Sequence, residues 1–357
     1  MKILHVITGM QKAAGTTTFV ENVVNRLRQQ EHDVEIVMSP DGFCQCDIIH
    51  IHGLWSGLLH RAACYARHNK IPVVWSTHGM TAPWAMRHKW WKKLLAWLLY
   101  QKRDLRQAAV IHCTTELEVG WNKSLGFKNC FIAPLGTNEH QFHSPTPTRN
   151  SNYTHTLLFV GRIYPVKGLV NLIRAWAIVN SQPITHNSQN RAIPFSNSNS
   201  KLQLHHNWKL RIVGPDQAGH QAELENLVLE LGLGDSVEFV GSKFGDELSE
   251  EYDNCDCLVL PSFTENFGAT IVDALAHVKP CIASTFTPWN ELQDRGCGWW
   301  VSNEPDKLAN AIRKMIDAGG ENRREMGLRG RKLVEEKYTW DAVVKAMVNG
   351  YEEVLNG

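Results

Sequence analysis

Two cations lie close together in a loop that follows an apolar run. Arg162 and Lys167 stand between Gly161 and Gly168, directly after residues 157–160. A guanidinium fork and an ammonium beside a helix N-terminus suit a diphosphate, because cations and free helix N–H groups both attract phosphate oxygens. The alternative is a pair of solvated surface charges. The position at the end of a strand, between two glycines, favours the diphosphate site.

A second strand-to-helix turn carries two carboxylates. Glu265 lies in the turn after the apolar run 257–260, Gly268 follows, and Asp273 is predicted about two turns into the next helix. Ionised carboxylates only accept hydrogen bonds, so we expect Glu265 to bind the hydroxyls of a sugar and Asp273 those of a ribose. For Asp273 the alternative is a helix residue paired with a neighbouring charge.

Histidines offer the remaining chemistry. His78 follows a predicted strand and precedes Gly79, so we expect its imidazole at the rim of a ligand crevice. His50 and His52 alternate on a predicted strand and share a face, which could indicate a metal. No acidic or cysteine partner lies at ligand spacing, and the sequence has no Asp-x-Asp. We therefore interpret the pair as structural and predict metal-independent chemistry.

Short apolar runs alternate with segments of helical spacing along all 357 residues, which predicts two α/β domains with parallel sheets. We place the first domain at residues 1–148 and the second at 149–337, with a last helix at 338–357 packing back on the first. Polar, proline-containing stretches predict a linker at 144–153 and a surface insertion at 181–207. The predicted strands are 2–7, 34–38, 47–51, 73–75, 110–112, 131–133, 157–160, 210–213, 237–240, 257–260, 281–283 and 299–301.

Composition excludes several classes of function. Lys plus Arg number 37 against 36 for Asp plus Glu, so no net charge indicates nucleic acid. Nine cysteines form no regular framework, which favours free thiols in a reducing cytosol. The apolar start is too short for a signal peptide, and no run reaches the roughly 18 residues of a membrane span. We expect a cytoplasmic protein.

A basic and aromatic segment at 87–106 contains seven Lys or Arg and four Trp or Tyr. On a helix its leucines and tryptophans would form one face flanked by cations, as in a helix that lies on anionic lipid. Trp90, Trp91, Lys92 and Lys93 are then candidates for contact with a membrane or an acceptor. The alternative is a core helix whose basic edge reaches solvent.

These motifs together resemble the family-4 retaining glycosyltransferases of the GT-B fold, and above all the bacterial transferases that build capsular polysaccharide or O-antigen. The resemblance covers the chain apart from the insertion. It depends on His78-Gly79, Thr114-Thr115-Glu116, Gly161-Arg162-x4-Lys167-Gly168, Leu260-Pro261-Ser262, Glu265-Asn-Phe-Gly268 and Thr287-Pro288-Trp289-x-Glu291.

The resemblance implies two Rossmann-like domains, with a nucleotide-sugar donor held by the second and a saccharide acceptor, lipid-linked at the inner membrane face, entering from the first. Arg162 and Lys167 would hold the diphosphate, and Glu265 the donor sugar. His78 would stand near the reacting face of the sugar. The family implies no cofactor and favours a UDP-sugar. Further donor contacts implied are Gly15, Gly161, Asn266, Phe267, Gly268, Ala269 and Asp273.

Two departures and two alternatives accompany this prediction. The family usually has a glutamate where this chain has Asp273, and a Gly-Gly pair near Ala14-Gly15. A nucleotide-sugar epimerase of the same architecture is the alternative enzyme. A sugar-nucleotide-binding protein that has lost catalysis is the alternative without activity.

Overall fold

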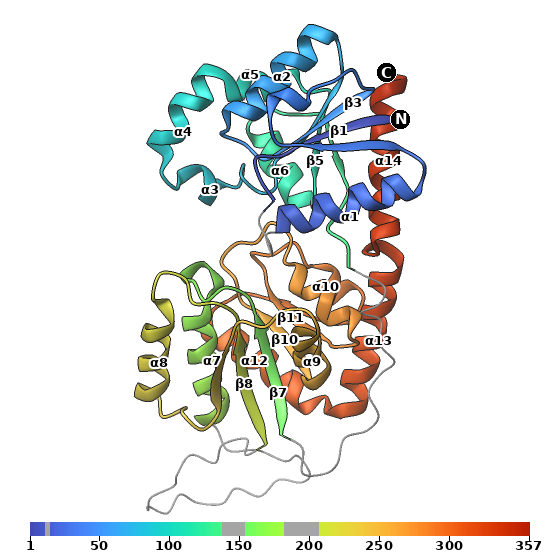
Figure 1. Ribbon diagram of the computed structural model, residues 1–357. Coiled ribbons are helices and arrows are strands. Elements are labelled where there is room, and N and C mark those ends of the chain that lie inside the picture. Colours follow the sequence, from blue (N-terminus) through green and yellow to red (C-terminus); the bar gives the residue numbers. More distant parts are fainter. Residues whose placement is uncertain (11–14, 138–153, 182–206) are drawn as a thin grey trace, which may run out of the picture. The chain divides into compact units, whose positions relative to one another are not determined.

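The computed structural model describes residues 1–10, 15–137, 154–181 and 207–357 (Figure 1). Residue contacts divide the chain into two compact units. The first unit comprises Met1–Glu139, Glu265–Ala269 and Glu335–Gly357, and the second comprises His140–Thr264 and Thr270–Val334. The predicted linker at 144–153, nearly all of the insertion predicted at 181–207, and Ala14 lie outside the described residues.

The first unit is built on a six-stranded parallel sheet with strand order β2-β1-β3-β4-β5-β6. Its central strands are buried along nearly their whole length because a parallel sheet is covered on both faces. In β3 all five side chains are buried, including those of His50 and His52. The strands are β1 (Lys2–Val6), β2 (Asp33–Val37), β3 (Ile48–His52), β4 (Val73–Ser76), β5 (Val110–Cys113) and β6 (Cys130–Ile132).

Helices cover both faces of this sheet, and the last helix of the chain is one of them (Figure 1). The last helix contributes five residues to a buried cluster that also contains residues of strands and of the first helix, Gly15–Gln29. These five residues are Trp340, Val343, Val344, Met347 and Tyr351. The predicted return of the C-terminal helix to the first domain is therefore confirmed. The helices are α1 (Gly15–Gln29), α2 (Gly57–Asn69), α3 (Pro83–Arg87), α4 (Trp90–Ala96), α5 (Lys102–Gln107), α6 (Glu116–Ser124) and α14 (Trp340–Asn356).

The second unit contains another six-stranded parallel sheet, with strand order β12-β11-β10-β7-β8-β9. The strands are β7 (His155–Val160), β8 (Trp208–Val213), β9 (Val237–Gly241), β10 (Cys257–Leu260), β11 (Cys281–Ser284) and β12 (Gly298–Val301). The helices are α7 (Leu169–Ser181), α8 (His220–Glu230), α9 (Asp246–Asn254), α10 (Ala269–Ala276), α11 (Glu291–Asp294), α12 (Pro305–Asp317) and α13 (Gly319–Lys337). Because β7 and β10 are neighbours, the loops that follow them emerge side by side.

Each predicted strand corresponds to an observed strand, and no bound differs by more than two residues. The segment 87–106 differs more, because it does not form one helix. Helix α3 ends at Arg87, Lys89 adopts a left-handed conformation with φ of 50°, and α4 begins at Trp90. A π-helical turn at Trp97–Gln101 then joins α4 to α5.

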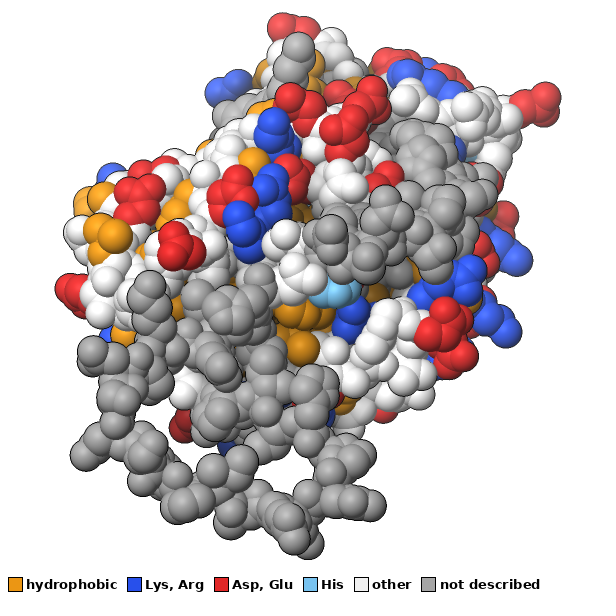
Figure 2. Space-filling view, turned by 90° about the horizontal axis from the view of Figure 1, so that it is seen from below, with side chains coloured by type: hydrophobic (Ala, Val, Ile, Leu, Met, Phe, Trp, Pro, Cys, Tyr) orange, Lys and Arg blue, Asp and Glu red, His pale blue; other side chains and the backbone are white. Residues whose placement is uncertain are grey.

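Charges on the described surface are mixed. Figure 2 shows one face of the molecule, on which acidic and basic side chains are interspersed and do not gather into a patch of one sign. This agrees with the formal net charge of +1. On that face the surface offers no extended field for a polyanion.

The packing of α14 generates the first prediction. Trp340 is 1% exposed, so Trp340→Ala should lower the free energy of unfolding by about 3–5 kcal/mol through lost burial and an unfilled cavity. Leu355 lies on the same helix at 42% exposure, and Leu355→Ala should change stability by less than about 0.5 kcal/mol. Urea unfolding followed by circular dichroism measures both. Equal losses in the two variants would contradict this packing.

Candidate functional site

His78 is held in place by a buried carboxylate of the first unit. His78 lies directly beyond β4 with a left-handed backbone (φ 48°), a conformation that costs energy for a residue other than glycine. Glu118 of α6, which is 0% exposed, fixes this loop. Its Oε1 accepts hydrogen bonds from the hydroxyl of Thr77 and from the N–H of Gly79, each at 2.6 Å. The loop that carries His78 is thereby tied to α6.

Glu118 also fixes the loop after β5. Its Oε2 accepts from the N–H of Thr114 at 2.8 Å and from the hydroxyl of Thr114 at 3.0 Å. Sequence reasoning missed this residue, although a signal was present. Thr115-x-x-Glu118 has the spacing of a capping box, and the Thr115 hydroxyl does accept from the Glu118 N–H at 3.2 Å. The Glu118 side chain, however, joins two loops at the site instead of capping its own helix.

A chain of hydrogen bonds with one possible proton order crosses the core of the first unit. His112 Nε2 lies 2.8 Å from the carbonyl oxygen of Ala133 and must donate to it. His112 Nδ1 therefore accepts from the Ser76 hydroxyl at 2.6 Å, and the Ser76 oxygen accepts from His50 Nε2 at 2.6 Å. His50 Nδ1 then accepts from the Tyr351 hydroxyl at 2.6 Å. Every imidazole in this chain is neutral, with one donor and one acceptor nitrogen.

This proton order bears on the metal alternative considered for His50 and His52. Nitrogens of His5, His50 and His52 lie within 4.8 Å of one another, so the three residues form a candidate metal cluster. A metal ligand needs a free lone pair, but His50 Nε2 carries a proton and its Nδ1 accepts from Tyr351. Binding a metal through either nitrogen of His50 would break the buried hydrogen bond that this nitrogen makes.

Burial keeps these imidazoles uncharged. Loss of hydration lowers the pKa of His5 to about 3 and that of His78 to about 4, and for His78 the Glu118 carboxylate opposes the shift. Burial likewise holds the pKa of His50 and of His52 well below the ordinary value of histidine, and it lowers the pKa of His112. At neutral pH, His78 therefore presents a neutral ring.

The predicted cations lie in the second unit, on the loop after β7. Arg162 is exposed, and its Nη1 donates to Oε1 of Gln217 in the loop after β8 at 2.9 Å. Lys167 ends a short 3-10 turn at Pro165–Lys167 and is partly exposed. Both side chains can therefore reach an anion at the carboxyl edge of the sheet.

Two glycines let the loops around these cations pack backbone against backbone. A Cβ on Gly168 would lie 2.2 Å from the carbonyl oxygen of Pro261, which directly follows β10, and Gly168 has a left-handed φ of 72°. A Cβ on Gly214 would lie 1.9 Å from the carbonyl oxygen of Gly161. The Phe263 N–H also donates to the carbonyl oxygen of Val166 at 2.8 Å. The loops after β7, β8 and β10 form one continuous edge.

The remaining predicted residues are divided between the two units. Asp273 lies in α10, one turn from its start at Ala269, so the predicted distance of two turns was wrong. Its carboxylate contributes to a raised pKa of the Tyr252 phenol, although burial is the larger cause. Glu265 is half-buried, and residues 265–269, including Asn266, Phe267 and Gly268, group by contacts with the first unit. Gly15 is the first residue of α1.

The segment predicted to touch membrane is exposed. Figure 1 shows α3 and α4 at the periphery of the first unit, away from its strands. Leu95, Leu98 and Leu99 are 65–70% exposed, and Trp91 is 63% exposed, so the alternative of a core helix is wrong. Lys92 Nζ lies 5.1 Å from the Trp91 ring centre. We call the following set the aromatic–basic surface: Trp84, Trp90, Trp91, Lys92, Lys93, Leu94, Leu95, Leu98 and Leu99.

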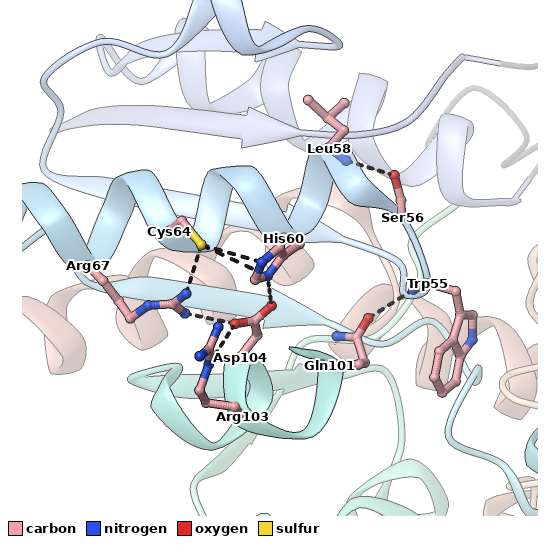
Figure 3. Close-up of polar contacts among 9 residues, drawn as sticks. All are labelled: Trp55, Ser56, Leu58, His60, Cys64, Arg67, Gln101, Arg103 and Asp104. Carbon is pink, nitrogen blue, oxygen red and sulfur yellow. Dashed lines mark hydrogen bonds and ion pairs between the residues drawn. The ribbon is translucent and has the colours of Figure 1, made fainter. Parts of the chain in front are cut away.

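A second buried carboxylate anchors the end of this surface (Figure 3). Asp104 of α5 is buried, and its two oxygens accept from Nδ1 of His60 at 2.6 Å and from Nη1 of Arg67 at 2.8 Å. Both donors come from α2. Gln101 Oε1 also accepts from the Trp55 N–H at 2.9 Å. The exposed leucines are therefore presented on a base that is fixed to the sheet-covering helix α2.

Among the described helices, none combines the length and the apolar character needed to cross a bilayer. The nine cysteines all lie in the described part of the chain and form no disulfide with one another, as their spacing predicted.

Comparison with known families assigns both parts of the chain. The model of glycosyl transferases group 1 matches residues 147–333, which is more than half of the chain. The model of the glycosyl transferase 4-like domain matches residues 44–129.

Among curated proteins, an uncharacterized glycosyltransferase of Methanocaldococcus jannaschii is 31% identical over 199 residues, which are 55% of this chain and 44% of that protein. The matched stretches span less than half the length of this and two further curated relatives. Among solved structures, sucrose-phosphate synthase from Thermosynechococcus elongatus has a TM-score of 0.75 at 19% identity, covering 99% of both chains. Anabaena HepE, solved with UDP and glucose, has a TM-score of 0.71 at 16% identity, also covering 99% of both chains. The fold is GT-B, as the motifs predicted.

The buried histidines generate a prediction on stability. Their folded pKa values lie below the unfolded value of about 6.5, so the unfolded state binds more protons once the pH falls below 6.5. The stability that the neutral rings provide is complete above pH 6.5 and declines as the pH falls toward their folded values. Between pH 6.5 and 5, the free energy of unfolding should fall by more than about 1.4 kcal/mol per pH unit, the slope of one proton.

Urea denaturation at half-unit pH steps measures this slope. The window lies above the ordinary pKa of most carboxylates, which limits their contribution. A flat profile between pH 6.5 and 5 would contradict the buried neutral cluster. The His112→Asn variant, which removes one of the titrating rings, should show a shallower slope.

Proposed function

The chain belongs to the group 1 glycosyl transferases, and on that premise we propose that it transfers a hexosyl group from a nucleotide-sugar donor to a hydroxyl of a saccharide acceptor. The observation that carries the proposal is the edge formed by the loops after β7, β8 and β10. It places Arg162 and Lys167, both accessible, at the carboxyl ends of parallel strands. Two fixed cations at such an edge suit the diphosphate of a nucleotide sugar.

The proposed reaction retains configuration at the anomeric carbon. The glycosidic bond to the diphosphate breaks, and the acceptor hydroxyl attacks from the same face of the sugar. The leaving diphosphate takes the proton of that hydroxyl. Arg162 and Lys167 stabilise the charge that develops on the diphosphate, which supplies much of the rate and requires no metal. His78 binds the sugar as a neutral hydrogen-bond donor, Glu265 accepts from sugar hydroxyls and Asp273 from the ribose.

UDP-sugars are the donors we propose, supported by the likeness of the fold to HepE with UDP and glucose. An epimerase of the same architecture would need acid–base groups around one sugar. Beyond Glu265, the first unit offers His78 with a pKa of about 4 and Glu118, whose oxygens are fully occupied by hydrogen bonds, which is a poor set for proton transfer at neutral pH. An epimerase would convert the nucleotide sugar without an acceptor, whereas the proposed transferase requires one.

The acceptor we propose is a lipid-linked saccharide at the cytoplasmic face of the membrane, in surface-polysaccharide synthesis of the capsule or O-antigen kind. The aromatic–basic surface supports this part. Its exposed leucines and tryptophans could enter the interface of a bilayer while its lysines meet anionic headgroups. The protein would then act as a peripheral membrane enzyme.

The donor site generates an activity prediction. Arg162→Ala and Lys167→Ala should each lower turnover on the order of 10²-fold, because each removes a cation that stabilises the leaving diphosphate. Arg174→Ala is the matched control, since Arg174 is an exposed arginine on α7 of the same unit. Release of nucleoside diphosphate in the presence of acceptor measures the rate. Near wild-type turnover in Arg162→Ala would overturn the assignment.

The aromatic–basic surface generates a binding prediction. The double substitution of Lys92 and Lys93 to Glu should abolish sedimentation with vesicles that contain anionic lipid at low salt, because each lysine near such a surface contributes about 1 kcal/mol. The control replaces Lys123 and Lys128, exposed lysines of the same unit, in the same way. Leu95→Ser with Leu98→Ser should weaken binding at high salt as well. Unchanged binding in the lysine variant, or dimers on size exclusion that the leucine variant dissociates, would contradict the membrane role.

A further inference from the structure

Two further histidines form a second hydrogen-bonded chain that ends at His78. His5 Nδ1 lies 2.8 Å from His52 Nε2, and His52 Nδ1 lies 3.1 Å from His78 Nε2. The ring planes of His5 and His52 differ by 11° with centroids 5.1 Å apart, and those of His52 and His78 by 24° at 5.4 Å. Each distance between ring centroids exceeds the distance between the two bonded nitrogens by about twice the distance from a ring's centre to its nitrogen. The rings therefore meet edge to edge, as a hydrogen bond between imidazoles requires.

The proton order in this chain follows from its buried end. A neutral imidazole has one N–H and one lone pair, so all protons must point the same way along His5, His52 and His78. His5 Nε2 is buried and has no hydrogen-bond partner among the described residues. If the protons point toward His5 (the inward order), its Nε2 carries a buried N–H without an acceptor. If they point toward His78 (the outward order), His5 Nε2 has only an unused lone pair. Orphaned buried N–H groups are the rarer case, so the outward order is favoured.

The outward order determines what His78 offers. His5 Nδ1–H donates to His52 Nε2, and His52 Nδ1–H donates to His78 Nε2. The single proton of His78 must then reside on Nδ1, and no described residue forms a hydrogen bond with that atom. The His78 ring is half-buried, and the carboxylate of Glu118 fixes its backbone through Gly79. An isolated neutral imidazole prefers the opposite tautomer, with the proton on Nε2.

We propose that His5 and His52 are positioning residues that fix His78 in the Nδ1–H tautomer and so direct a neutral N–H donor toward a sugar oxygen. The part that concerns the sugar rests on the function proposed above. The tautomer itself follows from the first unit alone. Neither His5 nor His52 touches the ligand in this scheme, and each acts only through the ring that follows it in the chain.

The test uses the full-length protein labelled with ¹⁵N-histidine. Long-range ¹H–¹⁵N spectra at pH 7 distinguish the protonated from the unprotonated ring nitrogen, and the His78 signals are those absent from His78→Gln. The wild type should show His78 protonated at Nδ1. His52→Phe retains an aromatic ring of similar shape without a donor, and His78 should then shift toward the Nε2–H tautomer. In His52→Gln the side-chain amide can donate to His78 Nε2, so the Nδ1–H tautomer should persist.

Turnover should follow the tautomer, with a loss of about tenfold in His52→Phe, the effect of one hydrogen bond, and recovery in His52→Gln. His78 protonated at Nε2 in the wild type, or an unchanged tautomer in His52→Phe, would overturn the proposal. If circular dichroism shows that His52→Phe does not fold, the spectra of the wild type and of His52→Gln still decide whether His78 is protonated at Nδ1. A tautomer that switches as expected in a protein that transfers no sugar would contradict the proposed function and leave the positioning role intact.

Discussion

All-parallel strand pairing is the constraint on which the rest of this structure depends. In each sheet the strands end at one edge, so residues far apart in sequence are delivered to the same place by the loops that follow β4 and β5, or β7, β8 and β10. The cost of this arrangement is that both sheet faces must be covered. In the first unit the C-terminal helix α14 supplies part of the cover, and its Tyr351 reaches His50 in the middle of the sheet.

The polar groups singled out in the two units differ in their exposure. In the first unit the polar groups around His78 form hydrogen bonds with other groups of the same unit. The two oxygens of Glu118 accept from four donors, and His5, His52 and His78 form hydrogen bonds with one another. Such a network is rigid, and in the tautomer that we propose it leaves Nδ1 of His78 to donate to a ligand. In the second unit Arg162 and Lys167 are accessible to solvent at the carboxyl edge of the sheet. At this edge Gly168 and Gly214 let the backbones of neighbouring loops touch. In the proposed reaction the first unit therefore orients the sugar and the second supplies positive charge.

The sequence predicts the sheets well because apolar runs bounded by glycine or polar residues mark buried parallel strands directly. The C-terminal helix was equally visible from its amphipathic spacing. The sequence did not predict the breaks in helical structure within residues 87–106. Nothing in the composition indicates that Lys89 adopts a left-handed conformation or that Trp97–Gln101 forms a π-helical turn. The position of Arg162 and Lys167 in the loop after a strand could be predicted, and their role stays a prediction. The His5–His52–His78 chain could not, because His5 and His52 lie on different strands and the direction of each side chain depends on strand register. Glu118 was missed because its partners lie in the two loops after β4 and β5, which are far from each other in sequence.

The most direct test of the central claim is a thermal-shift screen of the wild-type protein against UDP-sugars and GDP-sugars. At a concentration 100-fold above its dissociation constant, the true donor should stabilise the protein by roughly 2–3 kcal/mol, and the nucleoside diphosphate alone should retain part of that effect. Arg162→Ala should lose most of the shift, whereas Arg174→Ala should keep it. A protein that no nucleotide sugar stabilises, or a shift that survives in Arg162→Ala, would contradict the account.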